Sequence, residues 1–90
     1  MTHIVYILFS NNNGQFYTGY TNNLLKRLKE HNSGKVLSTK YRLPLILVYY
    51  EVCGKEKDAR AREKYLKSGM GKRYINNRIK GHLKTIKKKI

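Results

Sequence analysis

The sequence predicts an α/β fold, a small sandwich in which a three-stranded, mainly antiparallel sheet is flanked by three helices. Three observations lead to this expectation. Ninety residues are enough for one hydrophobic core but not for two. Three short segments are rich in the aromatic and β-branched residues that favour strands. Three further segments carry apolar residues at the spacing of amphipathic helices.

The first two strands are expected to form a β-hairpin. Residues 3–9 are rich in Ile, Val, Tyr and Phe, and an Asn-rich turn at 10–14 separates them from a second strand at 15–20. In such a hairpin Tyr6 and Tyr17 can fall on the same face of the sheet. Two tyrosines on neighbouring strands serve either core packing or chemistry, and both interpretations remain open.

A turn at Gly19 leads into the first helix, residues 24–31. Arg27 and His31 are four residues apart, so they lie on one side of this helix at the edge of its leucine stripe. A strand that ends in a tyrosine, a glycine without a side chain, and a helix presenting arginine and histidine together suggest a phosphate site. The alternative is an ordinary solvated helix face.

The third strand is predicted at residues 43–52, after a polar, basic surface loop that includes Lys40. Its apolar run is too β-branched and too short for a helix. Pro44 fits only at the start of a strand, because proline cannot donate to the ladder. We expect this segment to be the central strand of the sheet.

The second helix, residues 55–67, places an acid on its inward face. At roughly 100° per residue, Ala59, Glu63 and Leu66 share that face. A buried carboxylate costs several kcal/mol unless it is paired or binds a metal. A salt bridge from Glu63 to Arg27 or another base therefore competes with a metal site.

The third helix is expected to begin near Lys72. Asn76 lies at the margin of its apolar stripe and could face the interior. The sequence is divided into a domain at 1–83 and a basic, frayed C-terminal tail at 84–90.

The charge of the chain points to a polyanionic partner. Twenty Lys and Arg face five Asp and Glu, for a net charge of +15. Nucleic acid is the first candidate, and a membrane surface is disfavoured because there is no Trp and few large apolar residues oppose the charges. The single cysteine, Cys53, excludes an intrachain disulfide and fits a reducing, cytoplasmic location. No apolar run approaches the ~20 residues of a membrane span.

Taken together, these residues resemble the GIY-YIG nuclease family. The first family tripeptide is present at residues 4–6 as Ile-Val-Tyr, with Ile in place of Gly. The second is present at 17–19 as Tyr-Thr-Gly, with Thr in place of Ile. Residues 21–24 and 27–31 look like the family's usual continuation, and 59–67 look like its glutamate-bearing helix. The resemblance covers nearly the whole chain and implies a stand-alone catalytic module.

The resemblance implies an endonuclease that hydrolyses DNA phosphodiester bonds, in repair or recombination, with one Mg²⁺ or Mn²⁺ ion held by Glu63. Arg27 would hold the scissile phosphate and stabilise the charge of the transition state. Tyr17 or Tyr6 would activate water; the resemblance favours Tyr17, with Tyr6 orienting. His31 would help to move the proton or bind phosphate. The implied catalytic residues are Tyr6, Tyr17, Arg27, His31 and Glu63, and the implied substrate-binding residues are Gly19, Lys40 and Asn76.

Two other functions fit the composition. A non-catalytic nucleic-acid-binding module would use the same basic face and tyrosines for backbone contact and stacking. A small ribosome- or nucleoid-associated protein requires only the charge. Glu63 discriminates between them and an enzyme, because a polyanion binder gains nothing from an inward acid near its phosphate site.

Overall fold

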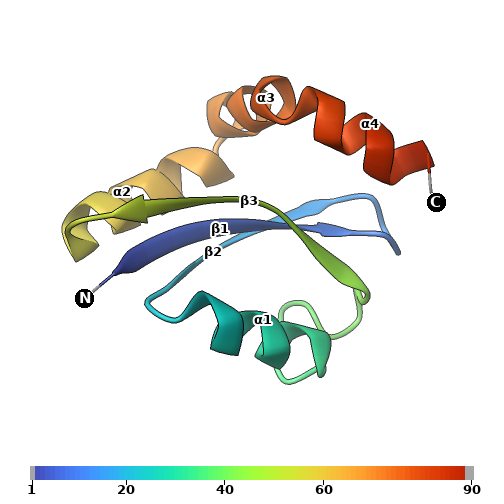
Figure 1. Cartoon of the computed structure of the whole chain (residues 1–90), viewed down its shortest axis with the longest axis horizontal. Coiled ribbons are helices and arrows are strands. Elements are labelled where there is room, and N and C mark those ends of the chain that lie inside the picture. The colour runs from blue at the N-terminus through green and yellow to red at the C-terminus, as the bar shows by residue number, and fades with distance from the viewer. Residues whose placement is uncertain (1, 89–90) are drawn as a thin grey trace.

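Three strands and four helices follow one another in the computed structural model, which describes residues 2–88 (Figure 1). The strands are β1 (His3–Ser10), β2 (Phe16–Thr21) and β3 (Leu45–Cys53). The helices are α1 (Leu24–Asn32), α2 (Glu56–Lys67), α3 (Gly69–Arg78) and α4 (Lys80–Lys88). The predicted α/β class and the three-stranded antiparallel sheet are confirmed, with four described helices in place of three.

β1, not β3, is the central strand. The strand order is β2-β1-β3, and both pairings are antiparallel. The prediction that residues 43–52 form the centre is therefore wrong. All residues from Ile4 to Phe9 are buried, because both faces of β1 are covered. β3 lies at an edge, where Tyr50 and Val52 remain 53% and 58% exposed.

The two faces of the sheet carry two hydrophobic clusters. Alternation along β1 sends Tyr6 and Leu8 to the face covered by α1, where Leu24 and Leu28 pack against them. The opposite face is covered by α2, α3 and α4 (Figure 1). Its buried cluster comprises Val5, Ile7, Phe9, Val48, Ala59, Leu66, Ile75 and Ile86.

The chain turns sharply between α2 and α3. The Ser68 side chain accepts a hydrogen bond from the Gly71 amide at 3.1 Å, so α3 begins at Gly69 rather than near Lys72 as predicted. A Cβ atom at position 71 would collide with the Tyr65 carbonyl oxygen. Glycine is therefore required for α3 to begin this close to α2.

α4 follows α3 after a break at Ile79 and buries Leu83 and Ile86. Much of the segment expected as a frayed tail at 84–90 is therefore helical as far as Lys88. Residues 89–90 lie outside the described part of the chain, and the proposed boundary at residue 83 stays a prediction. Within residues 2–88, no helix is both long and apolar enough to cross a membrane.

Candidate active site

Tyr6 lies at the centre of the site, fully buried beneath α1. Its partner across the β1–β2 ladder is Gly19. A Cβ atom at position 19 would lie 2.5 Å from both Cζ and Oη of Tyr6. Glycine at this position lets the phenol ring lie directly over the β2 backbone. The close approach expected at Gly19 is thus made by Tyr6, and contact of Gly19 with a substrate stays a prediction.

His31 holds the Tyr6 hydroxyl from the α1 side. Its Nε2 lies 2.8 Å from Tyr6 Oη, and its Nδ1 lies 2.8 Å from Thr39 Oγ1. Burial lowers the pKa of His31 to about 4, and the Arg27 charge acts in the same direction, so the imidazole is neutral at pH 7. A neutral imidazole donates from one nitrogen and accepts at the other.

Arg27 fixes the direction of these hydrogen bonds. Its Nε donates to Tyr6 Oη at 3.4 Å, and its Nη1 donates to Glu30 Oε1 at 3.3 Å. Burial raises the pKa of Tyr6 to about 12, although the Arg27 hydrogen bond opposes this, so Tyr6 keeps its proton. Since Tyr6 Oη accepts from Arg27, we assign its own proton to His31 Nε2, which leaves Nδ1–H to donate to Thr39.

The Arg27 guanidinium is consequently held in one orientation at the surface. Its side chain is 35% exposed. The hydrogen bond to Tyr6 raises the pKa of Arg27 further above its ordinary value. Beside it lies an open hollow of about 430 Å³. The other residues that line the hollow are Tyr20, Thr21, Asn22, Asn23, Lys26 and Glu30.

Tyr17 joins the same face, as predicted. Its ring centroid lies 6.3 Å from that of Tyr6 and 5.1 Å from that of His31. The Arg42 guanidinium carbon lies 5.8 Å from the Tyr17 ring centroid. Tyr17 is only half-buried, whereas Tyr6 is not exposed at all. Tyr17 is therefore the tyrosine that solvent and a substrate can reach.

Glu63 approaches the site from α2. Its side chain is 16% exposed, with Oε2 3.1 Å from Lys67 Nζ and Oε1 3.5 Å from Arg60 Nη1. The predicted alternative of a salt bridge is thus realised with bases of the same helix and not with Arg27. The negative charge of Glu63 also contributes to the raised pKa of Tyr6, which places the two groups in one electrostatic environment.

The donor set around Glu63 fits a hard cation that brings its own ligands. Among the described residues, no group of three or more His, Cys, Asp or Glu side chains comes together. Residues 2–88 therefore offer no cluster of side-chain ligands of the kind that holds a structural zinc ion. Mg²⁺ is commonly held by one or two carboxylates with water and substrate phosphate completing its shell. One partly buried carboxylate satisfies that requirement.

Three predicted site residues do not have the surroundings expected of them. His31 has no exposed surface, so it reaches Tyr6 and Thr39 but not a bound phosphate. Lys40 places its Nζ 4.9 Å from the Tyr41 ring centroid, in the surface loop. The expectation that Asn76 faces inward is wrong: it is exposed, and its Nδ2 donates to the Lys72 carbonyl of its own helix at 2.9 Å. With Ile75 directed into the core, the next residue is rotated by about 100° toward solvent.

Thr39 is the functional-looking residue that the sequence did not reveal. It is fully buried although it belongs to the polar loop between α1 and β3. Nothing in the sequence around Thr39 distinguishes it from an exposed loop threonine. Only the packing of the loop against α1 brings its hydroxyl to His31.

Residues 2–74 match the model of the GIY-YIG catalytic domain. The chain belongs to the GIY-YIG family. The matched part of this GIY-YIG domain contains Tyr6, Tyr17, Arg27, His31 and Glu63, and ends before Asn76. The two family tripeptides lie on the paired strands β1 and β2, which is why their tyrosines meet.

Relatives support the same assignment. The GIY-YIG chain is 45% identical over 67 residues to a UPF0213 protein of Bacillus licheniformis, covering 73% of this chain and 68% of that protein. It is 50% identical over 52 residues to a UPF0213 protein of Streptococcus pyogenes serotype M5, covering 57% of this chain and 56% of the relative, so the match spans just over half of that protein. The solution NMR structure of a UPF0213 protein from Bacillus halodurans shares 35% sequence identity and a TM-score of 0.55, covering 86% of this chain and 84% of that one.

Proposed function

We propose that this GIY-YIG protein is a divalent-metal-dependent endonuclease that hydrolyses phosphodiester bonds in DNA. One observation carries the proposal: the tyrosines of both family tripeptides and Arg27 converge on one face, with Arg27 Nε 3.4 Å from Tyr6 Oη. The net charge of +15 supplies the attraction for a polyanion. A role in DNA repair or recombination stays a prediction.

Arg27 is the proposed phosphate ligand. Tyr6 and Glu30 each hold one of its nitrogens, so the guanidinium is oriented before a substrate arrives. Pre-oriented donors stabilise developing charge better than mobile ones, because nothing has to reorganise during the reaction. Arg27 thus binds the scissile phosphate and stabilises the extra negative charge of the pentacovalent transition state.

Tyr17 is the proposed base and Tyr6 the positioning residue. Tyr6 keeps its proton, is wholly buried, and uses its oxygen to hold Arg27. Tyr17 is accessible, and as the general base it would act in its deprotonated form. It accepts the proton of the attacking water as the new P–O bond forms, and the bond from phosphorus to the leaving oxygen breaks.

His31 and Thr39 support this arrangement without touching the substrate. Neutral His31 accepts the Tyr6 proton, and Thr39 accepts from the other ring nitrogen. This chain of hydrogen bonds holds the Tyr6 oxygen where Arg27 can donate to it. Glu63 would hold the metal ion, Mg²⁺ or Mn²⁺. When bound, the ion would supply Lewis-acid polarisation of a phosphate oxygen.

A non-catalytic binding module is the second candidate, and one observation favours it. Glu63 already has two cationic partners, Arg60 and Lys67, so its charge is balanced without a metal. Both side chains are more than half exposed, however, and such ion pairs contribute little to stability. A metal ion can therefore compete with the two bases for Glu63, and a phosphate can compete with Glu63 for the two bases.

The test is a cleavage assay on labelled duplex, nicked, flapped and single-stranded DNA with Mg²⁺ or Mn²⁺, compared with EDTA. Glu63→Gln preserves shape and removes the charge, so cleavage should fall by a factor of about 10²–10³ while DNA binding persists. Glu56→Gln is the matched control, because Glu56 pairs with the same Arg60 but lies on the exposed first turn of α2.

The outcomes separate the two candidates. Parent protein that binds every substrate and cuts none with either metal would establish the binding module. Glu63→Gln protein that cuts as fast as the parent would contradict the metal assignment. A large loss of thermal stability in Glu63→Gln, compared with Glu56→Gln, would show that the ion pairs of Glu63 are its main role.

A further inference from the structure

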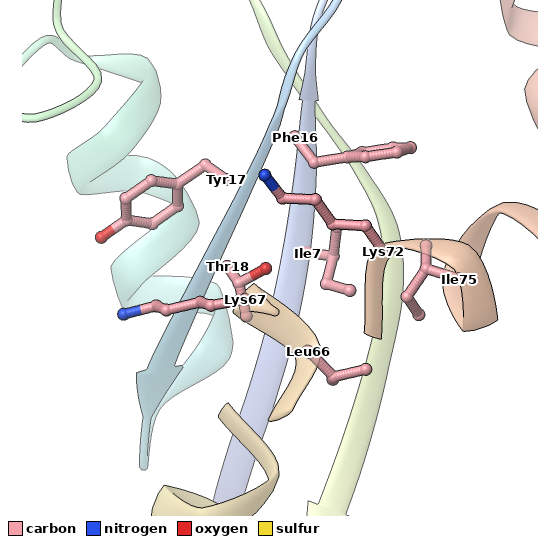
Figure 2. A pocket seen from close by; sticks show the side chains of 8 residues that line it. All are labelled: Ile7, Phe16, Tyr17, Thr18, Leu66, Lys67, Lys72 and Ile75. Atoms are coloured by element: carbon pink, nitrogen blue, oxygen red, sulfur yellow. The ribbon is translucent and has the colours of Figure 1, made fainter. Parts of the chain in front are cut away.

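A second cavity, of about 190 Å³, opens beside β2 on the face opposite Tyr17 (Figure 2). It lies between the first half of β2 and the junction of α2 with α3. Its lining residues are Ile7, Phe16, Tyr17, Thr18, Leu66, Lys67, Lys72 and Ile75. Figure 2 shows the Tyr17 ring pointing away from it, across the strand. The cavity thus adjoins the candidate active site but is not part of it.

The chemistry of the walls is apolar within and cationic at the rim. Ile7, Leu66 and Ile75 are each 1% exposed, and the Phe16 ring lies along one side (Figure 2). Lys67 and Lys72 are exposed residues of the same cavity. Such a cavity favours a flat, largely apolar group that is attached to an anion.

Thr18 adds a polar contact to this apolar cavity. The residue is only 8% exposed, and Figure 2 shows its hydroxyl oxygen directed into the cavity. The hydroxyl oxygen is not among the fully buried, unpaired side-chain atoms of residues 2–88, so it is open to the cavity rather than enclosed in the core. A hydroxyl can both donate and accept a hydrogen bond. A ligand with a donor or acceptor edge would satisfy it.

Lys67 connects the cavity to the proposed metal ligand. Its Nζ lies 3.1 Å from Glu63 Oε2, while the same side chain lines the cavity. In Figure 2 the Lys67 nitrogen lies on the same side of β2 as the Tyr17 hydroxyl. A group that occupies the cavity would therefore share Lys67 with the proposed metal ligand, Glu63.

The size of the cavity limits what can enter. Small-molecule sites typically measure ~300–1,000 Å³. At about 190 Å³, this cavity has room for one ring system but not for a whole nucleotide. The sugar and phosphates would remain outside, within reach of the two lysines.

We propose that this cavity binds an unpaired nucleobase from the nucleotide next to the scissile phosphate. The inference rests on the proposed nuclease function and deepens it. The partly buried Phe16 side chain contacts a face of the ring, Thr18 hydrogen-bonds to its edge, and Lys67 and Lys72 contact the flanking phosphates. A base that is stacked and paired within a duplex cannot enter, so the preferred DNA has an unpaired base beside the cut.

The test compares three labelled duplexes that differ at one position: fully paired, with one unpaired base, and with an abasic residue at the unpaired position. Binding is measured by fluorescence anisotropy in the presence of EDTA, because EDTA prevents metal-dependent cutting. The unpaired base should bind about tenfold more tightly than the abasic form, because burying one stacked base is worth that much. 2-Aminopurine at the same position should change its fluorescence on binding.

Variants assign the effect to the cavity. Thr18→Val is nearly isosteric, and it should weaken binding of the unpaired base roughly fivefold without changing binding of the abasic duplex. Thr18→Ser should restore the preference. Thr85→Val makes the same chemical change on the exposed face of α4 and should alter nothing. Lys72→Gln should weaken all three duplexes equally.

The results distinguish the inference from the proposed function. Absence of binding to every duplex would overturn both. Metal-dependent cleavage combined with equal affinity for the unpaired-base and abasic duplexes would overturn the base-binding cavity alone and leave the nuclease standing. An unchanged preference in Thr18→Val, with its thermal stability intact, would overturn the contact with Thr18.

Discussion

Replacing Gly19 by alanine tests how the site is assembled. The added methyl group would lie 2.5 Å from Cζ and Oη of Tyr6, about 1 Å closer than an ordinary van der Waals contact. The Tyr6 ring cannot swing aside, because it is fully buried and its hydroxyl is held by His31 and Arg27. The variant must therefore displace the ring or push β2 away from β1.

The expected cost combines two effects. Overfilling a packed core typically costs ~1–3 kcal/mol, and losing a buried hydrogen bond costs about 1 kcal/mol more. We expect Gly19→Ala to lower the free energy of unfolding by about 3 kcal/mol. For a domain of this size that corresponds to a fall in Tm of roughly 12–24 °C. Cleavage should fall as well, because the Arg27 guanidinium loses its support.

Urea and thermal denaturation measure this cost. Gly81→Ala is the matched control: the same methyl group meets no atom within 4 Å, and alanine in α4 should gain about 0.5–1 kcal/mol. Tyr6→Leu supplies the second arm of a double-mutant cycle, because it removes the atoms that Gly19→Ala would strike. The reasoning is refuted if Gly19→Ala unfolds at the parent's temperature, or if its cost is the same in the Tyr6→Leu background.

Two further predictions concern the buried hydrogen bonds of His31. Thr39→Val should lower the free energy of unfolding by about 1–3 kcal/mol and reduce cleavage, because the Nδ1–H group of His31 loses its acceptor. Thr39→Ser should restore both. Unchanged cleavage in Thr39→Val would contradict the positioning role. Folding lowers the pKa of His31 from 6.5 to about 4, so the unfolded chain binds a proton at His31 more readily than the folded protein does. The protein therefore has its full stability above pH 6.5. Its free energy of unfolding falls by about 3 kcal/mol as the pH is lowered toward 4. Urea denaturation between pH 4 and 7.5 should show this slope in the parent and a shallower one in His31→Leu; equal slopes would exclude it.

The types of the secondary-structure elements could be predicted from local pattern, whereas the strand order could not. Residues 4–9 and 45–50 are both continuous apolar runs, so either could be buried on two faces. Coverage by the helices decides between them. Tyr50 pairs with Tyr6 across the ladder, yet it stays 53% exposed on the edge strand, whereas Tyr6 is buried in the cluster that includes Leu24 and Leu28 of α1.

The part of the site that could be predicted is the part whose geometry is local. Tyr6 and Tyr17 share a hairpin, and Arg27 lies on the helix that follows it, so periodicity is enough to bring them to one face. Thr39 and Asn76 depend on features that periodicity does not encode. The position of Thr39 depends on the path of the loop between α1 and β3. The direction of Asn76 depends on the residue at which α3 begins, which is fixed by the Ser68 cap.

The central position of β1 divides the proposed catalytic groups between two stretches of the chain. The tyrosines and Arg27 belong to the hairpin and α1, whereas Glu63 lies on α2, which packs on β1 and β2 after the chain has passed through β3 and closed back against the hairpin. That closure pairs distant residues, such as Ser10 with Leu45, and contacts of such sequence separation are slow to form. A molecule that is still folding and has not yet docked α2 on the sheet therefore holds the proposed phosphate-binding arginine without the carboxylate. For the proposed nuclease, an incompletely folded copy would be harmless to DNA.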